Sequence, residues 1–141
     1  MTKNRLVGTW KLVSFGTHGE DGSVLCAYGE NPVGYIMYGR DGYMHAALMK
    51  ANRPRVSHDL LPLTTTEEKA WAATYFESYC GKYEIKGNKV FHHVEVSLNP
   101  NWPGQVLERE VRLEGDNLTL VSPPLTLLGI TYTHRLVWKR V

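Results

Sequence analysis

Apolar and polar residues alternate along most of this chain in short runs, and turn-forming clusters separate the runs. Turn signals include "GEDGS" (19–23), "GRDG" (39–42) and "EGDN" (114–117), and the runs between them are rich in Val, Tyr, Leu, Ile and Thr. Many short strands with closely spaced turns are typical of a β-sandwich or a β-barrel. An antiparallel meander that closes into a barrel leaves no exposed sheet edge, so we predict an all-β, lipocalin-like barrel of about nine strands. The predicted strands are Thr9–Phe15, Val24–Tyr28, Val33–Tyr38, Tyr43–Met49, Gly81–Lys86, Val90–Leu98, Gln105–Leu113, Leu118–Val121 and Ile130–Lys139.

One segment, "TTTEEKAWAATYFESYCG" (64–81), departs from the alternating pattern and predicts a helix over about 65–79. Thr65 followed three residues later by Glu68 fits a capping box at the start of a helix. Residues four apart lie on one helical face, and an aromatic residue recurs there at each turn: Trp71, Tyr75 and Tyr79. We expect this helix to cap the barrel, with its aromatic face either sealing the core or contacting a ligand as a lid.

The composition is that of an ordinary globular protein, with 141 residues, 43% hydrophobic and 21% charged. This length suits one domain, 1–141. The net charge of +2 is spread without a basic run, so we expect no nucleic acid as a partner. No stretch has the length of a signal peptide or of a membrane span, so we expect a cytoplasmic protein without membrane contact.

Cofactor chemistry finds little support in the sequence. Cys26 and Cys80 are too few and too far apart for a disulfide framework or a redox motif. No P-loop, GxGxxG, GxSxG or HExxH motif is present, so we expect no cofactor.

The phase of the strands predicts which side chains face the interior of the barrel. In "VFHHVEVS" (90–97), the alternation places His92 on the inward apolar face with Val90, Val94 and Val96, and it places His93 on the outer face. The same reasoning turns Arg109 inward among apolar neighbours, and it turns His134 and Tyr132 inward on the last strand. If the 98–105 loop closes a hairpin with residues 94 and 109 opposite each other, His92 and Arg109 are diagonal neighbours.

An inward arginine needs a partner, because an unpaired buried charge is very costly. No acidic residue faces inward on the strands whose phase is clear, which favours a polar or anionic ligand group as the partner. The alternative is a structural network in which the protein itself satisfies Arg109. For the ligand interpretation we expect catalytic roles for His92, Arg109 and His134, and ligand contacts from Tyr35, Met44, Trp71, Tyr75 and Tyr132.

The first predicted strand carries Gly8-Thr9-Trp10 and resembles the Gly-x-Trp signature of lipocalins and related calycin barrels. In those folds the tryptophan closes the narrow end of the barrel, and a basic residue of the last strand packs over its ring. The final "LVWKR" supplies Arg140 for this contact. Further segments resemble the bacterial and fungal lipocalin-like domain family in the same order along nearly the whole chain: "PVGYIMYGRDGYM", the capped helix, "YCGKYEI", "V-x-H-x-V", "NPNWPG" and the arginine before "LEGDNLTL".

The resemblance implies a β-barrel with an internal cavity, and it leaves three functions open. The first is binding of a small hydrophobic ligand with a polar or anionic group. The second is a cofactor-free isomerase or cyclase that acts on a natural-product intermediate, with His92 or His134 as general acid or base and Arg109 stabilising negative charge. The third, a metal site of His92, His134 and His45, is the least favoured, because Met44 rather than His45 belongs to the core face. The pattern is also compatible with a homodimer.

Overall fold

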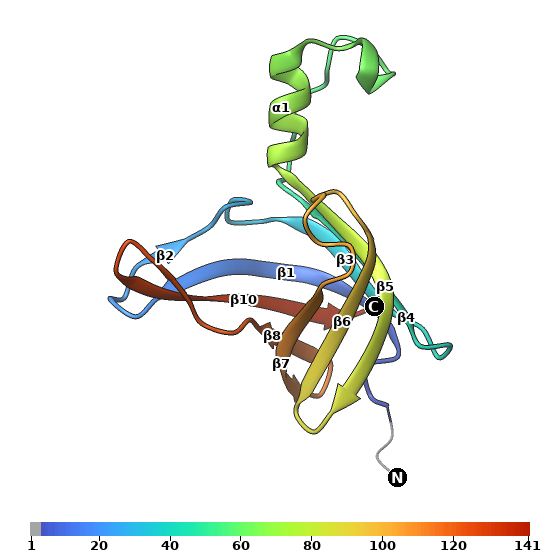
Figure 1. Ribbon diagram of the computed structural model, residues 1–141, viewed down its shortest axis with the longest axis vertical. Helices are drawn as coiled ribbons and strands as arrows, with labels where there is room; N and C mark the ends of the chain where they lie inside the picture. The colour runs from blue at the N-terminus through green and yellow to red at the C-terminus, as the bar shows by residue number, and fades with distance from the viewer. Residues whose placement is uncertain (1–3) are drawn as a thin grey trace.

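The computed structural model describes residues 4–141, in which ten strands form one sheet that closes into a barrel, with one projecting helix (Figure 1). The strands are β1 (Gly8–Gly19), β2 (Val24–Leu25), β3 (Val33–Tyr38), β4 (Tyr43–Met49), β5 (Phe76–Lys86), β6 (Lys89–Ser97), β7 (Val106–Glu114), β8 (Asn117–Val121), β9 (Leu125–Leu127) and β10 (Ile130–Arg140). A 3-10 turn, η1 (Leu61–Leu63), precedes the helix α1 (Thr66–Thr74).

The barrel is closed by its first and last long strands. The strands follow the order β2-β1-β3-β4-β5-β6-β7-β8-β10-β9, and β1 also pairs with β10 along almost its whole length. Eight strands therefore form the closed antiparallel barrel, while β2 and β9 flank the part of β1 and β10 that extends beyond it. The predicted fold class is confirmed. The alternation of buried and exposed residues along β3 and β4 shows the period of two that the sequence pattern required.

One end of the barrel is sealed around Trp10. Its side chain is fully buried, and its indole Nε1 donates a hydrogen bond of 2.9 Å to the carbonyl oxygen of Leu6. The Arg140 guanidinium lies over the Trp10 ring, 4.1 Å from the ring centroid, and also donates hydrogen bonds to the carbonyls of Val7 and Arg5. This arrangement confirms the cation–π contact that the resemblance implied, and it leaves the cavity to the other end of the barrel.

The helix begins where the sequence predicted and ends earlier. Thr65 and Glu68 form a capping box in which each side chain accepts a hydrogen bond from the other's backbone N–H. However, α1 stops at Thr74, and β5 begins at Phe76 and pairs with β4, so the predicted end at residue 79 is wrong. Aromatic residues are good strand formers, and the pairing with β4 outweighs the helical spacing of this segment. Tyr79 therefore belongs to a barrel strand.

The helix does not cap the barrel. In Figure 1, α1 projects from the start of β5, away from the barrel. Its base is held by Arg53, which donates a hydrogen bond of 3.0 Å to the carbonyl of Ala72 and lies 5.8 Å from the Trp71 ring. Tyr75 similarly receives the Lys50 ammonium at 4.9 Å from its ring centroid. Trp71 and Tyr75, which were predicted to contact a ligand, thus contact cations at the base of the helix and do not line the barrel cavity.

None of the helices within residues 4–141 has the length and apolar character that crossing a membrane requires.

A β-bulge between β5 and β6 changes the phase of one predicted strand face. The register passes from Cys80 opposite Val96 to Gly81 opposite Val94, so one β6 residue has no partner. A Cβ atom on Gly81 would collide with the carbonyl oxygen of His93, which explains the glycine at this close approach. Beyond the bulge Val96 is 64% exposed, contrary to its predicted inward position.

Candidate functional site

The barrel contains a cavity of about 270 Å³ at the end opposite the Trp10 seal. Most of its wall is apolar, and it includes Phe15, Ile36, Leu48, Leu120, Leu136 and Trp138. Besides the tyrosines Tyr28 and Tyr79, four polar side chains interrupt this wall: Thr17, Glu77, Arg109 and His134. An apolar chamber with a few convergent polar groups is the usual form of a small-molecule site.

Arg109 faces the cavity, and among the described residues no carboxylate lies within ion-pair distance of its guanidinium. It lies on β7, its Nη1 donates a hydrogen bond of 2.7 Å to the backbone oxygen of Glu108, and it forms no ion pair within residues 4–141. Val90 is its partner across β6 and β7, while His92 pairs with Leu107. The register differs from the predicted one, yet His92 and Arg109 are diagonal neighbours as predicted. The rest of the guanidinium fork is therefore available to an acceptor oxygen.

Glu77 is an inward acidic residue that the sequence reasoning missed. It is the second residue of β5 and pairs with Leu48, so its side chain lies on the inner face with that of Tyr79. Its Oε1 is buried and has no hydrogen-bond partner among the described residues. Burial raises the pKa of the Glu77 carboxyl above its usual value. A raised pKa favours the protonated carboxyl, which donates a hydrogen bond as well as accepting one, so the group suits a ligand hydroxyl or carbonyl.

His134 is the histidine that lines the cavity. Its Nδ1 lies 2.9 Å from Thr17 Oγ1, and its backbone N–H donates to Ser122 Oγ at 2.8 Å, so its ring position is fixed. Burial, and then the charge of Arg109, lower the pKa of His134 below its usual value. The ring is therefore neutral at neutral pH. Because Nδ1 is engaged by Thr17, Nε2 is the nitrogen that can serve a ligand.

His92 faces inward as predicted, but a hydrogen-bonding network separates it from the cavity. It is 1% exposed, and its Nε2 lies 2.7 Å from the hydroxyl of Tyr38 while its Nδ1 lies 2.9 Å from that of Tyr79. A neutral imidazole donates one of these bonds and accepts the other. Burial, followed by the charges of Arg109 and His93, lowers the pKa of His92 to about 3. Both ring nitrogens are thus engaged within the core, while Tyr79 contributes to the cavity wall.

The remaining predicted site residues fall in different places. Met44 is buried in the core but does not line the cavity. Tyr35 is 41% exposed on the outer face of β3, because Gly34 and Ile36 occupy the inner face; its predicted place in the wall is wrong. Tyr132 lies on the inner face of β10, beyond the residues that line the cavity.

The histidines do not converge on a metal. His45 lies on the exposed face of β4, where its Nε2 is 3.2 Å from Ser78 Oγ. This position separates it from His92 and His134. Within residues 4–141 no group of three or more His, Cys, Asp or Glu side chains has the geometry to hold a metal ion.

The family assignment rests on almost the entire chain. The model of a lipocalin-like domain family matches residues 7–141. The chain belongs to this lipocalin-like family. The assignment agrees with the closed barrel, with the Trp10 seal, and with the segments that carried the resemblance in the sequence.

Relatives of this lipocalin-like protein include a fungal carrier and bacterial proteins of known structure. The chain is 31% identical, over 107 residues, to the 4'-hydroxy-3'-methoxypropiophenone carrier protein ppsC of Aspergillus oryzae; the match covers 70% of this chain and 96% of the relative. A lipocalin-like protein from Bacteroides uniformis shares the fold, with a TM-score of 0.51, 15% identity, and coverage of 98% of this chain and all of that one. An uncharacterized protein from Bacteroides eggerthii has a TM-score of 0.43 and 15% identity, with coverage of 92% and 98%.

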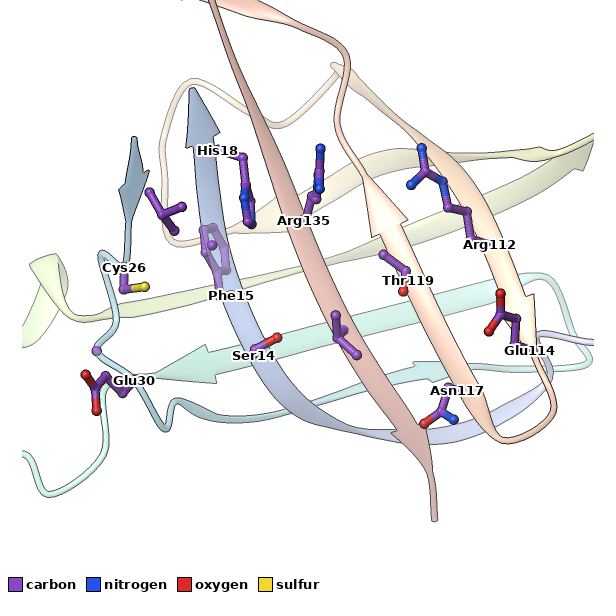
Figure 2. Close-up of a pocket in the computed structure, with 14 residues that line it drawn as sticks. Ser14, Phe15, His18, Cys26, Glu30, Arg112, Glu114, Asn117, Thr119 and Arg135 are labelled. Atoms are coloured by element: carbon purple, nitrogen blue, oxygen red, sulfur yellow. The ribbon is translucent and has the colours of Figure 1, made fainter. Parts of the chain in front are cut away.

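A second hollow, of about 610 Å³, lies on the outside of the lipocalin-like barrel. Figure 2 shows its side chains standing apart across neighbouring strands, from Cys26 and Glu30 at one edge to Arg112 and Glu114 at the other. It is larger than the interior cavity, but its polar groups are solvated and do not converge on one point. The interior cavity is therefore the better candidate for a small-molecule site, because low polarity strengthens every hydrogen bond made there.

Proposed function

We propose that this lipocalin-like protein binds a small, mainly apolar molecule inside its barrel and holds it by oxygen-bearing groups. One observation carries the proposal: Arg109 faces the cavity without an ion-pair partner within residues 4–141. A guanidinium in an apolar wall is costly unless something satisfies its donors, and an acceptor oxygen of a ligand would do so.

The lining of the cavity supports an aromatic ketone or phenol as the ligand class. Aromatic walls from Phe15, Tyr79 and Trp138 suit a flat ring. Arg109 favours a carbonyl or phenolate oxygen, and Glu77 accepts from or donates to a hydroxyl. The volume of about 270 Å³ lies just below the roughly 300–1,000 Å³ of sites for drug-sized ligands, so one ring with short substituents fits. The fungal relative is named as the carrier of such a compound, an aryl ketone.

Titration with 4'-hydroxy-3'-methoxypropiophenone tests this proposal, with calorimetry or tryptophan fluorescence as the measurement. Trp102 and Trp138 both line the cavity, so we expect saturable quenching of their emission. Arg109→Met should weaken binding by about tenfold or more, because a hydrogen bond to a charged group contributes about 1.5–3 kcal/mol. Arg112→Met is the matched control, since this arginine lies on the outer face of the same strand and pairs with Glu110. Absence of binding, or equal affinity in both variants, would overturn the proposal.

A cofactor-free isomerase or cyclase is the second candidate, and one observation favours it. Glu77 and His134 both line the cavity, and their pKa values are shifted toward each other, the first upward and the second downward. Such a pair can divide the roles of acid and base in proton transfer. His134 rather than His92 is then the proposed base, because His92 is bonded on both ring nitrogens. In this case His134→Gln abolishes turnover of a bound ketone while leaving its affinity within a few fold, and unchanged turnover removes the assignment.

A further inference from the structure

The first and last long strands carry a four-stranded sheet out of the barrel. β2 pairs with β1 and β9 pairs with β10, so the order across this sheet is β2-β1-β10-β9. Figure 1 shows β1 and β10 running away from the other barrel strands toward the β2 label. We call this sheet the extension. Its position matters because both of its central strands also line the cavity.

The inner face of the extension is continuous with the cavity wall. Thr17 and His134 form an opposite pair on β1 and β10, and both line the cavity. Opposite residues of antiparallel strands project to the same face, and residues two apart on a strand do so as well. The residues that share this face can therefore be followed outward from Thr17 and His134. They are Leu25, Tyr132, Leu125, Ile130 and Leu127.

This face is apolar, and much of it is exposed. Leu25 is 54% exposed, Leu125 49% and Leu127 54%. Tyr132 pairs with Gly19, and a Cβ atom on that glycine would lie 3.1 Å from Tyr132 Cε1 and 2.5 Å from both Asp21 Oδ1 and Ser23 Oγ, so glycine leaves room for these side chains. An apolar surface that leads directly from the rim of a cavity can receive the part of a ligand that the cavity does not hold.

We propose that the ligand is longer than the cavity and that its distal apolar part lies on the inner face of the extension. The inference rests on the proposed function, because it places the polar end of the ligand near Arg109 inside the barrel. The cavity is smaller than the usual site for a drug-sized molecule, and a longer ligand would project at the rim beside His134. The substrate class is thus an aromatic ketone or phenol with an alkyl or acyl chain of several carbons.

A homologous series tests the length of the site. The probes are 4-hydroxyphenyl alkyl ketones with acyl chains of two to eight carbons, and calorimetry measures each Kd. Complete burial of a methylene strengthens binding about fourfold, and half-burial on an open face about twofold. We expect Kd to fall by about twofold per added carbon across the longer members in the wild type.

Two neighbouring residues of one edge strand provide the variant and its control. Leu25 and Val24 are both 54% exposed, but Leu25 pairs with Thr17 on the inner face and Val24 pairs with His18 on the outer face. Leu25→Ser and Leu125→Ser should flatten the dependence on chain length, so that the longest probe binds about tenfold more weakly while the two-carbon probe is unaffected. Val24→Ser should match the wild type with every probe.

The outcomes separate this inference from the proposed function. If the two-carbon probe binds but longer chains bring no gain in the wild type, or if Val24→Ser and Leu25→Ser behave alike, the inference is overturned and the cavity site stands. If no member of the series binds, the proposed function fails and the inference fails with it.

Discussion

The hydrogen-bonding network around His92 leads to a prediction whose magnitude follows from the structure. Replacing His92 with Leu removes two buried hydrogen bonds, to Tyr38 and to Tyr79. Both tyrosines are at least nine-tenths buried, so their hydroxyls lose a partner where water does not replace it. An unsatisfied buried hydroxyl costs about 1–3 kcal/mol, and leucine restores part of the packing, so we expect a loss of about 3 kcal/mol in the free energy of unfolding.

The same reasoning predicts that further removal of polar groups restores stability. In the triple variant His92→Leu, Tyr38→Phe, Tyr79→Phe no hydroxyl of the network is left unsatisfied. Replacement of both partners by apolar groups is close to neutral, so the triple variant should unfold within about 1 kcal/mol of the wild type.

Urea denaturation followed by tryptophan fluorescence measures these differences, with equal m-values as the check that the comparison is sound. A loss of about 3 kcal/mol corresponds to a fall of about 10 °C in Tm for a chain of this size. If His92→Leu is as stable as the wild type, or if the triple variant is less stable than His92→Leu alone, the network does not stabilise the barrel as described.

Three further predictions concern pH, the sealed end and a turn. The pKa of His92 falls from 6.5 in the unfolded chain to about 3 in the fold, so between these pH values the unfolded state binds one more proton than the folded state. The stability that His92 contributes is therefore complete above pH 6.5 and declines by about 1.4 kcal/mol per pH unit as the pH falls to about 3. Acid titration should narrow the difference in free energy of unfolding between the wild type and His92→Leu. Arg140→Met removes the cation–π contact with Trp10 and two hydrogen bonds to backbone carbonyls, so thermal unfolding should show a loss of about 2–4 kcal/mol, and an unchanged Tm would contradict the role of Arg140 in the seal. Leu128 has a φ of 51° and precedes Gly129 in the two-residue turn between β9 and β10, so Leu128→Asn should raise the free energy of unfolding by about 1 kcal/mol in urea, and a loss would refute this account of the turn.

The alternation of apolar and polar residues in the sequence was enough to predict which strand side chains face the interior of the barrel. His92 and His93 were separated correctly because a paired strand exposes successive side chains on opposite faces, and Arg109 and His134 followed from the same period. The predicted register of β6 and β7 was wrong, yet His92 and Arg109 are diagonal neighbours in both the predicted and the observed register, because in each the residue opposite His92 lies two positions from Arg109.

The errors arose where distant pairing overrode local pattern. Residues 75–79 have helical spacing and strand-forming side chains at once, and only the pairing of β5 with β4 decides between them. Glu77 was missed for this reason, because a residue assigned to a helix has no strand phase. Val96 was misplaced by a bulge that depends on the approach of His93 to Gly81, and the partners of His92 come from strands far away in sequence. A short stretch of sequence does not show any of these contacts, because each joins residues on different strands.

The pairing of β1 with β10 also has a consequence for folding during translation. Trp10 pairs with Arg140, so the strand that closes the barrel is synthesised after all the other barrel strands. At about 5–20 residues per second, roughly 7–26 s separate the synthesis of Trp10 from that of Arg140, and during this time the nascent β1 has one edge without its final neighbour. Pairing over such a sequence distance is slow, and an open apolar edge is a template for intermolecular association. Chaperone dependence during translation, rather than low stability of the finished barrel, should therefore limit the yield of soluble protein.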